Sequence, residues 1–314
     1  MKKHNIIAMA LTSLMALPVI AQDSTPAVGD ILQGINMFTP EEGDPAYKVK
    51  ANEKYGTQWG VDMAYGLWNT EKVSDVKRHN NLALLHAQLN QRLIEDKANG
   101  GTWLRVEFSG SWGLDRESAQ SDTFFTEAYA TASGLHADAM GPHEGIFPEV
   151  ALMQYFAGKR ACLIAGMVNL TNYFDAVSIA NDSFSSFTND GFVNSTILPL
   201  VDSNIGGILQ VELNRNNYMM VAVSRTGCDS GYNPFNSDYC DGYAVVGEYG
   251  HIFADGAATL RINPFYTSTD VDMADGTGER RRQNAGLVAS IEYTPCAPLT
   301  IYSRAGFAAK QYLS

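Results

Sequence analysis

The sequence has few charges, few cysteines and, after its first twenty residues, no long apolar run. Downstream of residue 20, no apolar stretch approaches the ~18 residues that a membrane-spanning helix needs. Lys and Arg number 22 against 34 Asp and Glu, and the resulting formal charge of −12 argues against electrostatic binding of nucleic acid. Its 4 cysteines do not show the Cys/His spacing of a zinc site. A nucleophile elbow, a phosphate loop and a paired-carboxylate motif are also absent from the sequence, so we expect no enzyme activity, metal or cofactor.

The first 56 residues differ from the rest of the chain. Lys2 and Lys3 precede an apolar stretch over residues 6–20, and Val19-Ile20-Ala21 is a small-residue cleavage site. We therefore expect residues 1–21 to be a signal peptide for export. Residues 22–56 are rich in Pro, Asp, Glu and Gly without periodicity, so we expect an irregular periplasmic leader.

A disulfide is expected at one loop of this exported chain. Cys228 and Cys240 flank residues 229–239, which are rich in Gly, Asn, Asp and Pro. In an oxidising compartment the two ends of such a hairpin loop favour a disulfide. The alternative is that both thiols stay free, because spacing does not establish the Cα distance.

From residue 57 onward, segments of two-residue period are joined alternately by long and short connections. In residues 205–213, for example, Ile205, Leu209 and Leu213 share one face while Gln210 and Glu212 share the other. Hairpins that are tight at one end and long at the other are typical of an up-and-down sheet, and in transmembrane barrels the tight turns face the periplasm. Residues 57–314 therefore predict an all-β fold, a transmembrane up-and-down antiparallel β-barrel with eleven strands. Leu104, Phe108, Leu209 and Leu287 are expected to face lipid.

Alternation alone does not separate a membrane barrel from a sandwich. An exported soluble all-β protein, either sugar-binding or adhesin-like, remains the alternative, because it would bury the same apolar face in its core. The odd strand number also differs from the even number of bacterial single-chain barrels, which predicts a barrel truncated at its C-terminus.

Several short motifs carry a resemblance to a known family. They are Leu152-Met153-Gln154-Tyr155-Phe156, Gly158-Lys159-Arg160, Ile164-Ala165-Gly166-Met167, Asn172-Tyr173-Phe174 and residues 181–184. Together they resemble the carbohydrate-selective porins of the OprB type, although Asn172 stands where an acidic residue is usual. The resemblance implies a sixteen-stranded outer-membrane barrel that passes small sugars, as a monomer or a homotrimer. Its partners would be outer-membrane lipid and small carbohydrates.

Strand phase gives the candidate pore-lining residues. Sugar passage needs aromatic rings that stack on pyranose faces and charged or amide groups that bond hydroxyls. The side chains in the right phase are Arg92, Trp103, Arg105, Glu107, Glu212, Glu248, Arg261, Glu292 and Arg304. The alternative for each is a solvated wall without specific contacts. The loop at 169–204 adds the aromatic residues Tyr173, Phe174 and Phe184, which would either form a constriction or pack the loop against the wall.

Overall fold

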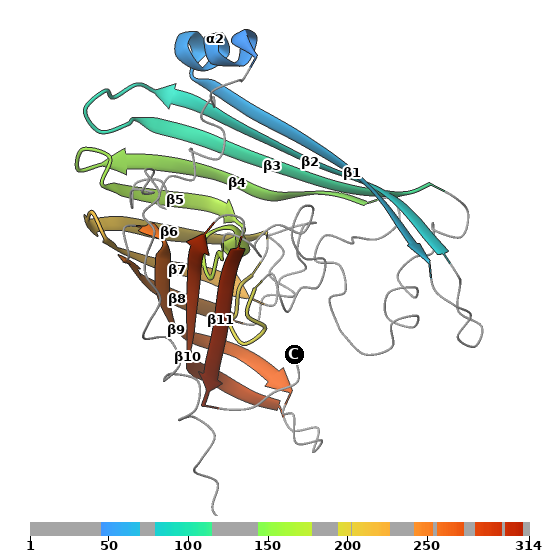
Figure 1. The fold of residues 1–314 in the computed structure, drawn as a ribbon, viewed down its shortest axis with the longest axis vertical. Coiled ribbons are helices and arrows are strands. Elements are labelled where there is room, and N and C mark those ends of the chain that lie inside the picture. Colours follow the sequence, from blue (N-terminus) through green and yellow to red (C-terminus); the bar gives the residue numbers. More distant parts are fainter. Residues whose placement is uncertain are drawn as a thin grey trace, which may run out of the picture.

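The computed structural model describes residues 45–69, 79–114, 144–177, 194–201, 203–226, 242–253, 256–272, 280–296 and 299–309 of the chain. Eleven antiparallel strands form one sheet in sequence order (Figure 1). They are β1 (Thr57–Asn69), β2 (His79–Ile94), β3 (Thr102–Gly113), β4 (Glu144–Phe156), β5 (Ala161–Val168), β6 (Asn204–Asn214), β7 (Asn217–Thr226), β8 (Gly242–Phe253), β9 (Ala258–Asp272), β10 (Arg280–Cys296) and β11 (Leu299–Ala308). The predicted all-β, up-and-down fold and its strand number are confirmed.

The sheet is curved and open. Each strand pairs with its neighbours in sequence, and among the described residues β1 and β11 are the two edges (Figure 1). The turns between β2 and β3, β4 and β5, and β6 and β7 are short, and all three lie at one end of the sheet. We call this end the short-turn end. No helix in the described part of the chain is long and apolar enough to cross a membrane.

The two faces of the sheet differ sharply in polarity. We call the face that carries Arg105 and Glu248 the inner face, because the segment after β5 packs against it. Its buried charged side chains include Arg105, Glu107, Glu149, Glu248, Arg261 and Glu292. The outer face exposes large apolar side chains along most strands, among them Trp59, Val61, Met63, Tyr65, Val150, Leu152, Leu163, Met219, Val221, Val223, Leu287, Ile301 and Phe307. An apolar outside around a polar inside is typical of transmembrane barrels.

The segment before β1 is helical, so the expectation of an irregular leader is wrong for these residues. Helix α2 (Ala46–Tyr55) begins after Pro45 and ends at Gly56, whose φ of 65° gives the left-handed cap. Its Ala, Lys and Glu residues favour helix, and a proline at the start with a glycine at the end delimits it. Residues 1–44, which include the expected signal peptide, lie outside the described part of the chain.

Candidate pore-lining site

Two stretches between β5 and β6 form a compact unit on the inner face. They are residues 169–177 and 194–201, which we call the inner segment. Its first turn is η3 (Leu170–Asn172), where the Asn169 side chain accepts from the Thr171 backbone N–H at 3.1 Å. The Leu170 N–H donates to the Val201 carbonyl at 3.1 Å, which joins the two stretches. Local capping and one backbone contact therefore give the inner segment its own shape.

Apolar side chains hold the inner segment against the middle of the sheet. Leu170, Phe174 and Leu198 belong to one buried cluster with inner-face residues of the wall. The wall residues include Met153, Ile164, Ile208, Met220, Val246 and Val288. Phe174 and Leu170 are completely buried. Tyr173 and Phe174 thus pack the loop against the wall, one of the two roles that the sequence left open, while Phe184 lies outside the described residues.

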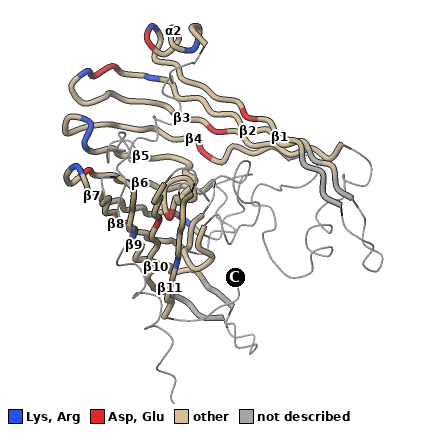
Figure 2. The backbone as a smooth tube through the Cα atoms, in the orientation of Figure 1, with Lys and Arg blue, Asp and Glu red and all other residues tan. Residues whose placement is uncertain are grey.

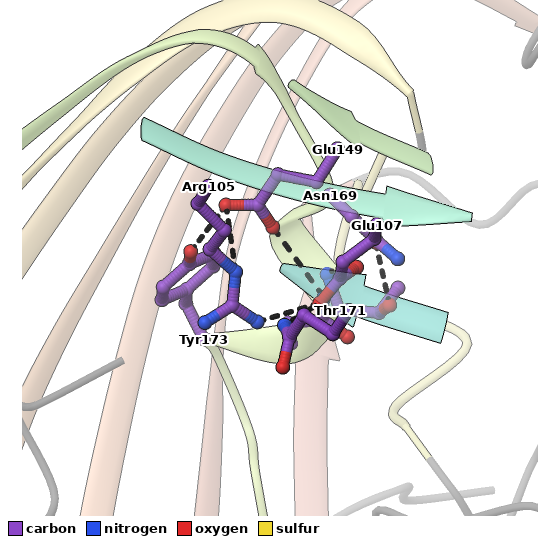
Figure 3. Close-up of polar contacts among 8 residues, drawn as sticks. Arg105, Glu107, Glu149, Asn169, Thr171 and Tyr173 are labelled. Carbon is purple, nitrogen blue, oxygen red and sulfur yellow. Dashed lines mark hydrogen bonds and ion pairs between the residues drawn. The ribbon is translucent and has the colours of Figure 1, made fainter. Parts of the chain in front are cut away.

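On the β3 and β4 side, a cluster of polar groups joins the inner segment to the wall (Figure 3). The Arg105 guanidinium lies between two carboxylates, with Nη2 at 2.5 Å from Glu107 Oε1 and Nε at 3.4 Å from Glu149 Oε1. The Tyr173 hydroxyl donates to Glu149 Oε1 at 2.5 Å, and the Asn172 amide donates to Glu107 Oε2 at 2.8 Å. Gln88 on β2 also donates to Glu107. All three charged side chains are at most 2% exposed, so these hydrogen bonds offset the cost of burying them.

Burial raises the pKa of Tyr173 well above its usual value, although the Arg105 charge opposes this. The hydroxyl therefore keeps its proton and acts as the donor to Glu149 at any physiological pH.

A second cluster lies on the β8 and β11 side. Arg304 Nε is 2.8 Å from Asp175 Oδ2 and 3.1 Å from Oδ1, and the Ser195 N–H donates to Oδ2 at 2.8 Å. The Asp175 backbone N–H donates to Glu248 Oε2 at 2.8 Å. Glu248 also accepts from the Tyr218 hydroxyl at 2.7 Å and from the Asn263 amide at 2.7 Å. The inner segment is thus attached by polar contacts to both sides of the curved sheet.

The position of Asp175 affects its proton affinity. Burial raises the pKa of this carboxyl, and the neighbouring Arg304 charge lowers it in part. Asp175 also has a φ of 55°, a left-handed conformation that Asp tolerates better than most residues. This backbone turn lets its N–H reach Glu248 while its side chain reaches Arg304.

The residues that strand phase selected lie on the inner face, but only some of them meet. Arg105 and Glu107 form an ion pair, and Arg92 lies over the Trp103 ring at 5.8 Å. Glu248 and Arg304 are linked through Asp175. Arg261 pairs with Glu292 at 3.2 Å. Glu212 lies apart from both clusters, near the β6–β7 turn, where its backbone carbonyl accepts from Arg160.

Three residues of the clusters were missed by strand phase. Glu149 is an isolated acidic residue among apolar inner-face neighbours, which is the one local signal that singles it out. Asn172 and Asp175 lie outside any strand, so no strand period assigns them to a face.

Two further expectations concern cysteines and metals. Cys162 and Cys296 are free, whereas Cys228 and Cys240 lie outside the described residues, so their disulfide stays a prediction. Within the described ranges, no group of three or more His, Cys, Asp or Glu residues is placed to hold a metal ion.

Comparisons with known proteins show a likeness of fold. No protein-family model matches the sequence, and a search of curated proteins gives no match. The structure of Pseudomonas putida OprB at high pH is similar, with a TM-score of 0.57 and 12% identity over 79% of this chain and 64% of that one. The chain therefore spans less than two thirds of the OprB structure. A mutant porin of Rh. blastica aligns with 10% identity over 79% of this chain and 99% of its own, but at a TM-score of 0.21 it carries no argument. At these identities the comparisons show that the chain has a porin-like fold.

Proposed function

We propose that the protein is an outer-membrane porin through which small carbohydrates diffuse. The observation that carries this proposal is the polarity of the two faces. In a soluble sandwich the apolar face would be buried and the charged face exposed. Here Leu152 and Val221 are 49% and 43% exposed on the outer face, whereas Arg105 and Glu149 are 1% and 0% exposed on the inner face.

The chemistry of the inner wall supports passage of sugars. Beside the inner segment, the inner faces of β1–β3 and β9–β11 carry amide and charged side chains such as Gln88, Asn90, Arg92, Arg261 and Asn263. Such groups hydrogen-bond hydroxyls without requiring a net charge on the solute. The motif resemblance to carbohydrate-selective porins points to the same class of solute. In this proposal Arg92, Trp103, Arg105, Glu107, Glu212, Glu248, Arg261 and Arg304 line the route, and Tyr173 and Phe174 narrow it.

The proposal also includes a location and an assembly. Residues 1–21 direct export, and the outer face contacts outer-membrane lipid. The short-turn end faces the periplasm, as in other outer-membrane barrels. The protein acts as a monomer or a homotrimer, and the remainder of a closed barrel lies beyond the eleven strands described here.

The test is single-channel conductance of the detergent-purified protein in a planar bilayer, titrated with glucose and maltose. We expect stable current steps that decrease as sugar occupies the pore. Steps that sugar leaves unchanged would contradict carbohydrate passage but leave a porin. A protein that gives no steps and stays in solution without detergent would overturn the membrane barrel in favour of the soluble sugar-binding or adhesin-like protein. A protein that needs detergent but gives no steps would contradict pore formation by this chain.

A further inference from the structure

Helix α2 is held firmly at the short-turn end of the sheet (Figure 1). The Arg92 N–H donates to the Gly56 carbonyl at 2.8 Å, and the Gln91 amide donates to the Tyr55 carbonyl at 3.0 Å. The Gln58 amide donates to Asn52 Oδ1 at 3.3 Å. These bonds tie both the last turn of α2 and the residue that follows it to β1 and β2. The helix is therefore part of the rigid sheet edge, although none of its residues is buried.

Aromatic rings and lysines alternate on this helix and on the first outer-face residues of β1. The Tyr47 and Trp59 rings are stacked at 6.1 Å, and Lys48 Nζ lies 4.8 Å from the Trp59 ring centre. Lys54 Nζ lies 4.8 Å from the Tyr55 ring, and both tyrosines are 60% exposed. Trp59 begins the apolar outer face that continues through Val61 and Met63. Amphipathic rings with ammonium groups at the edge of an apolar face are typical of a protein surface at the bilayer–water interface.

The short-turn end also carries an excess of positive charge (Figure 2). In α2 and the described turns at 95–101, 157–160 and 215–216, seven residues are basic and three are acidic, a net charge of +4. The basic residues are Lys48, Lys50, Lys54, Lys97, Lys159, Arg160 and Arg215, and the acidic ones are Glu53, Glu95 and Asp96. The whole chain has a net charge of −12, so this end has the opposite sign from the molecule.

We propose that α2 and these short turns form a binding surface for anionic phospholipid headgroups, such as phosphatidylglycerol, in the adjoining leaflet. The inference rests on the proposed function, because the outer face must contact lipid. Charge complementarity selects the anionic headgroup, since a basic surface next to a bilayer attracts acidic lipid. The aromatic rings of Tyr47, Tyr55 and Trp59 place the lysines at headgroup depth.

The experiment measures lipid selectivity by electron paramagnetic resonance. The whole protein is reconstituted in phosphatidylcholine vesicles that contain a trace of spin-labelled phosphatidylglycerol or spin-labelled phosphatidylcholine, and the motionally restricted fraction of each label is compared. We expect a several-fold preference for phosphatidylglycerol. Replacing Lys48, Lys50 and Lys54 together by Gln should reduce it, by at most about fivefold for each lysine. The matched control Glu53→Gln removes a negative charge from the same helix and should increase the preference. Because surface electrostatics are screened by salt, 0.5 M NaCl should lower the wild-type preference.

The outcomes separate this inference from the proposed function. Equal selectivity in the wild type and the triple lysine variant, or a preference that salt does not change, overturns headgroup binding. If such a protein still conducts and responds to sugar, the porin proposal stands alone. A wild-type protein that does not enter the vesicles overturns both.

Discussion

The attachment of Asp175 to Arg304 gives the most direct test of how the inner segment is held. Arg304→Gln removes a guanidinium that is 11% exposed and lies 2.8 Å from a carboxylate that is 0% exposed. Breaking a buried ion pair by removing one partner costs about 3–5 kcal/mol. The Ser195 N–H still donates to Asp175, and the carboxyl can bind a proton, so we expect the lower limit of about 3 kcal/mol. That free energy is a change of roughly 100-fold in the equilibrium for local opening.

Hydrogen exchange read by mass spectrometry measures this opening. The reporter amides are those of Leu170, Tyr173 and Phe174, which donate to backbone carbonyls within the inner segment. In Arg304→Gln we expect peptides from residues 169–177 to exchange about 100-fold faster, while peptides from β6 and β7 keep their rates. Arg215→Gln, at the exposed β6–β7 turn, is the matched control and should change nothing. Unchanged protection in Arg304→Gln, or an equal loss in Arg215→Gln, would refute the attachment.

The same pair makes stability depend on pH with a definite sign. Because burial raises the folded pKa of Asp175, the native chain binds this proton more tightly than the unfolded chain does. The contribution of Asp175 to the free energy of unfolding is therefore greatest below the unfolded pKa of about 3.9 and is lost as the pH rises through the folded pKa. The measurement compares wild type with Asp175→Asn by guanidinium unfolding over a series of pH values. The difference in stability should fall over this window and then stay constant, and a difference that rises with pH would contradict the argument.

Three further substitutions test other parts of the structure. Leu152→Arg places a charge on the outer face, where it should cost about 2–4 kcal/mol if the residue faces lipid but little if it faces water; guanidinium unfolding from lipid vesicles distinguishes the two. Gly250→Ala would place a Cβ 2.0 Å from the Tyr218 ring, so the ring should move and lose its 2.7 Å bond to Glu248. We expect about 1–3 kcal/mol of destabilisation by overpacking, and a lower denaturation midpoint checks it. Asn172→Asp introduces a carboxylate beside Glu107 and Glu149, so exchange in residues 169–177 should accelerate at neutral pH and slow again in acid, unlike in Asn172→Ala.

Much of the fold could be predicted because a strand has a strict two-residue period. Once a sheet has one apolar face, each charged residue in a strand reports which side it occupies. Arg105 and Glu107 on β3, and Arg261 on β9, lie on the same inner face for this reason. The alternation of tight and long connections gave the strand order, since consecutive antiparallel strands pair directly.

The contacts of the inner segment could not be predicted from local pattern. Asn172 and Glu107 are 65 residues apart in sequence, and Arg304 and Asp175 are 129 residues apart. Neither Asn172 nor Asp175 belongs to a periodic element, so no phase assigns their side chains to a partner. Helix α2 was missed for another reason, because its ten residues are short and mostly polar, and only Pro45 and Gly56 mark its ends.

The strands on which the inner segment rests differ from the others in a way that sequence can reveal. A pore wall in contact with water should be polar inside, yet β5 is apolar along its whole length, and β7 is apolar on both faces from Tyr218 to Val223. The outer side chains of these strands are exposed, while inner ones such as Ile164 and Met220 belong to the cluster around Leu170 and Phe174. Alternation disappears because the inner face is covered by the chain itself instead of water. In an up-and-down barrel sequence, strands that lose their polar face thus mark the section of wall that supports an inward-folded loop.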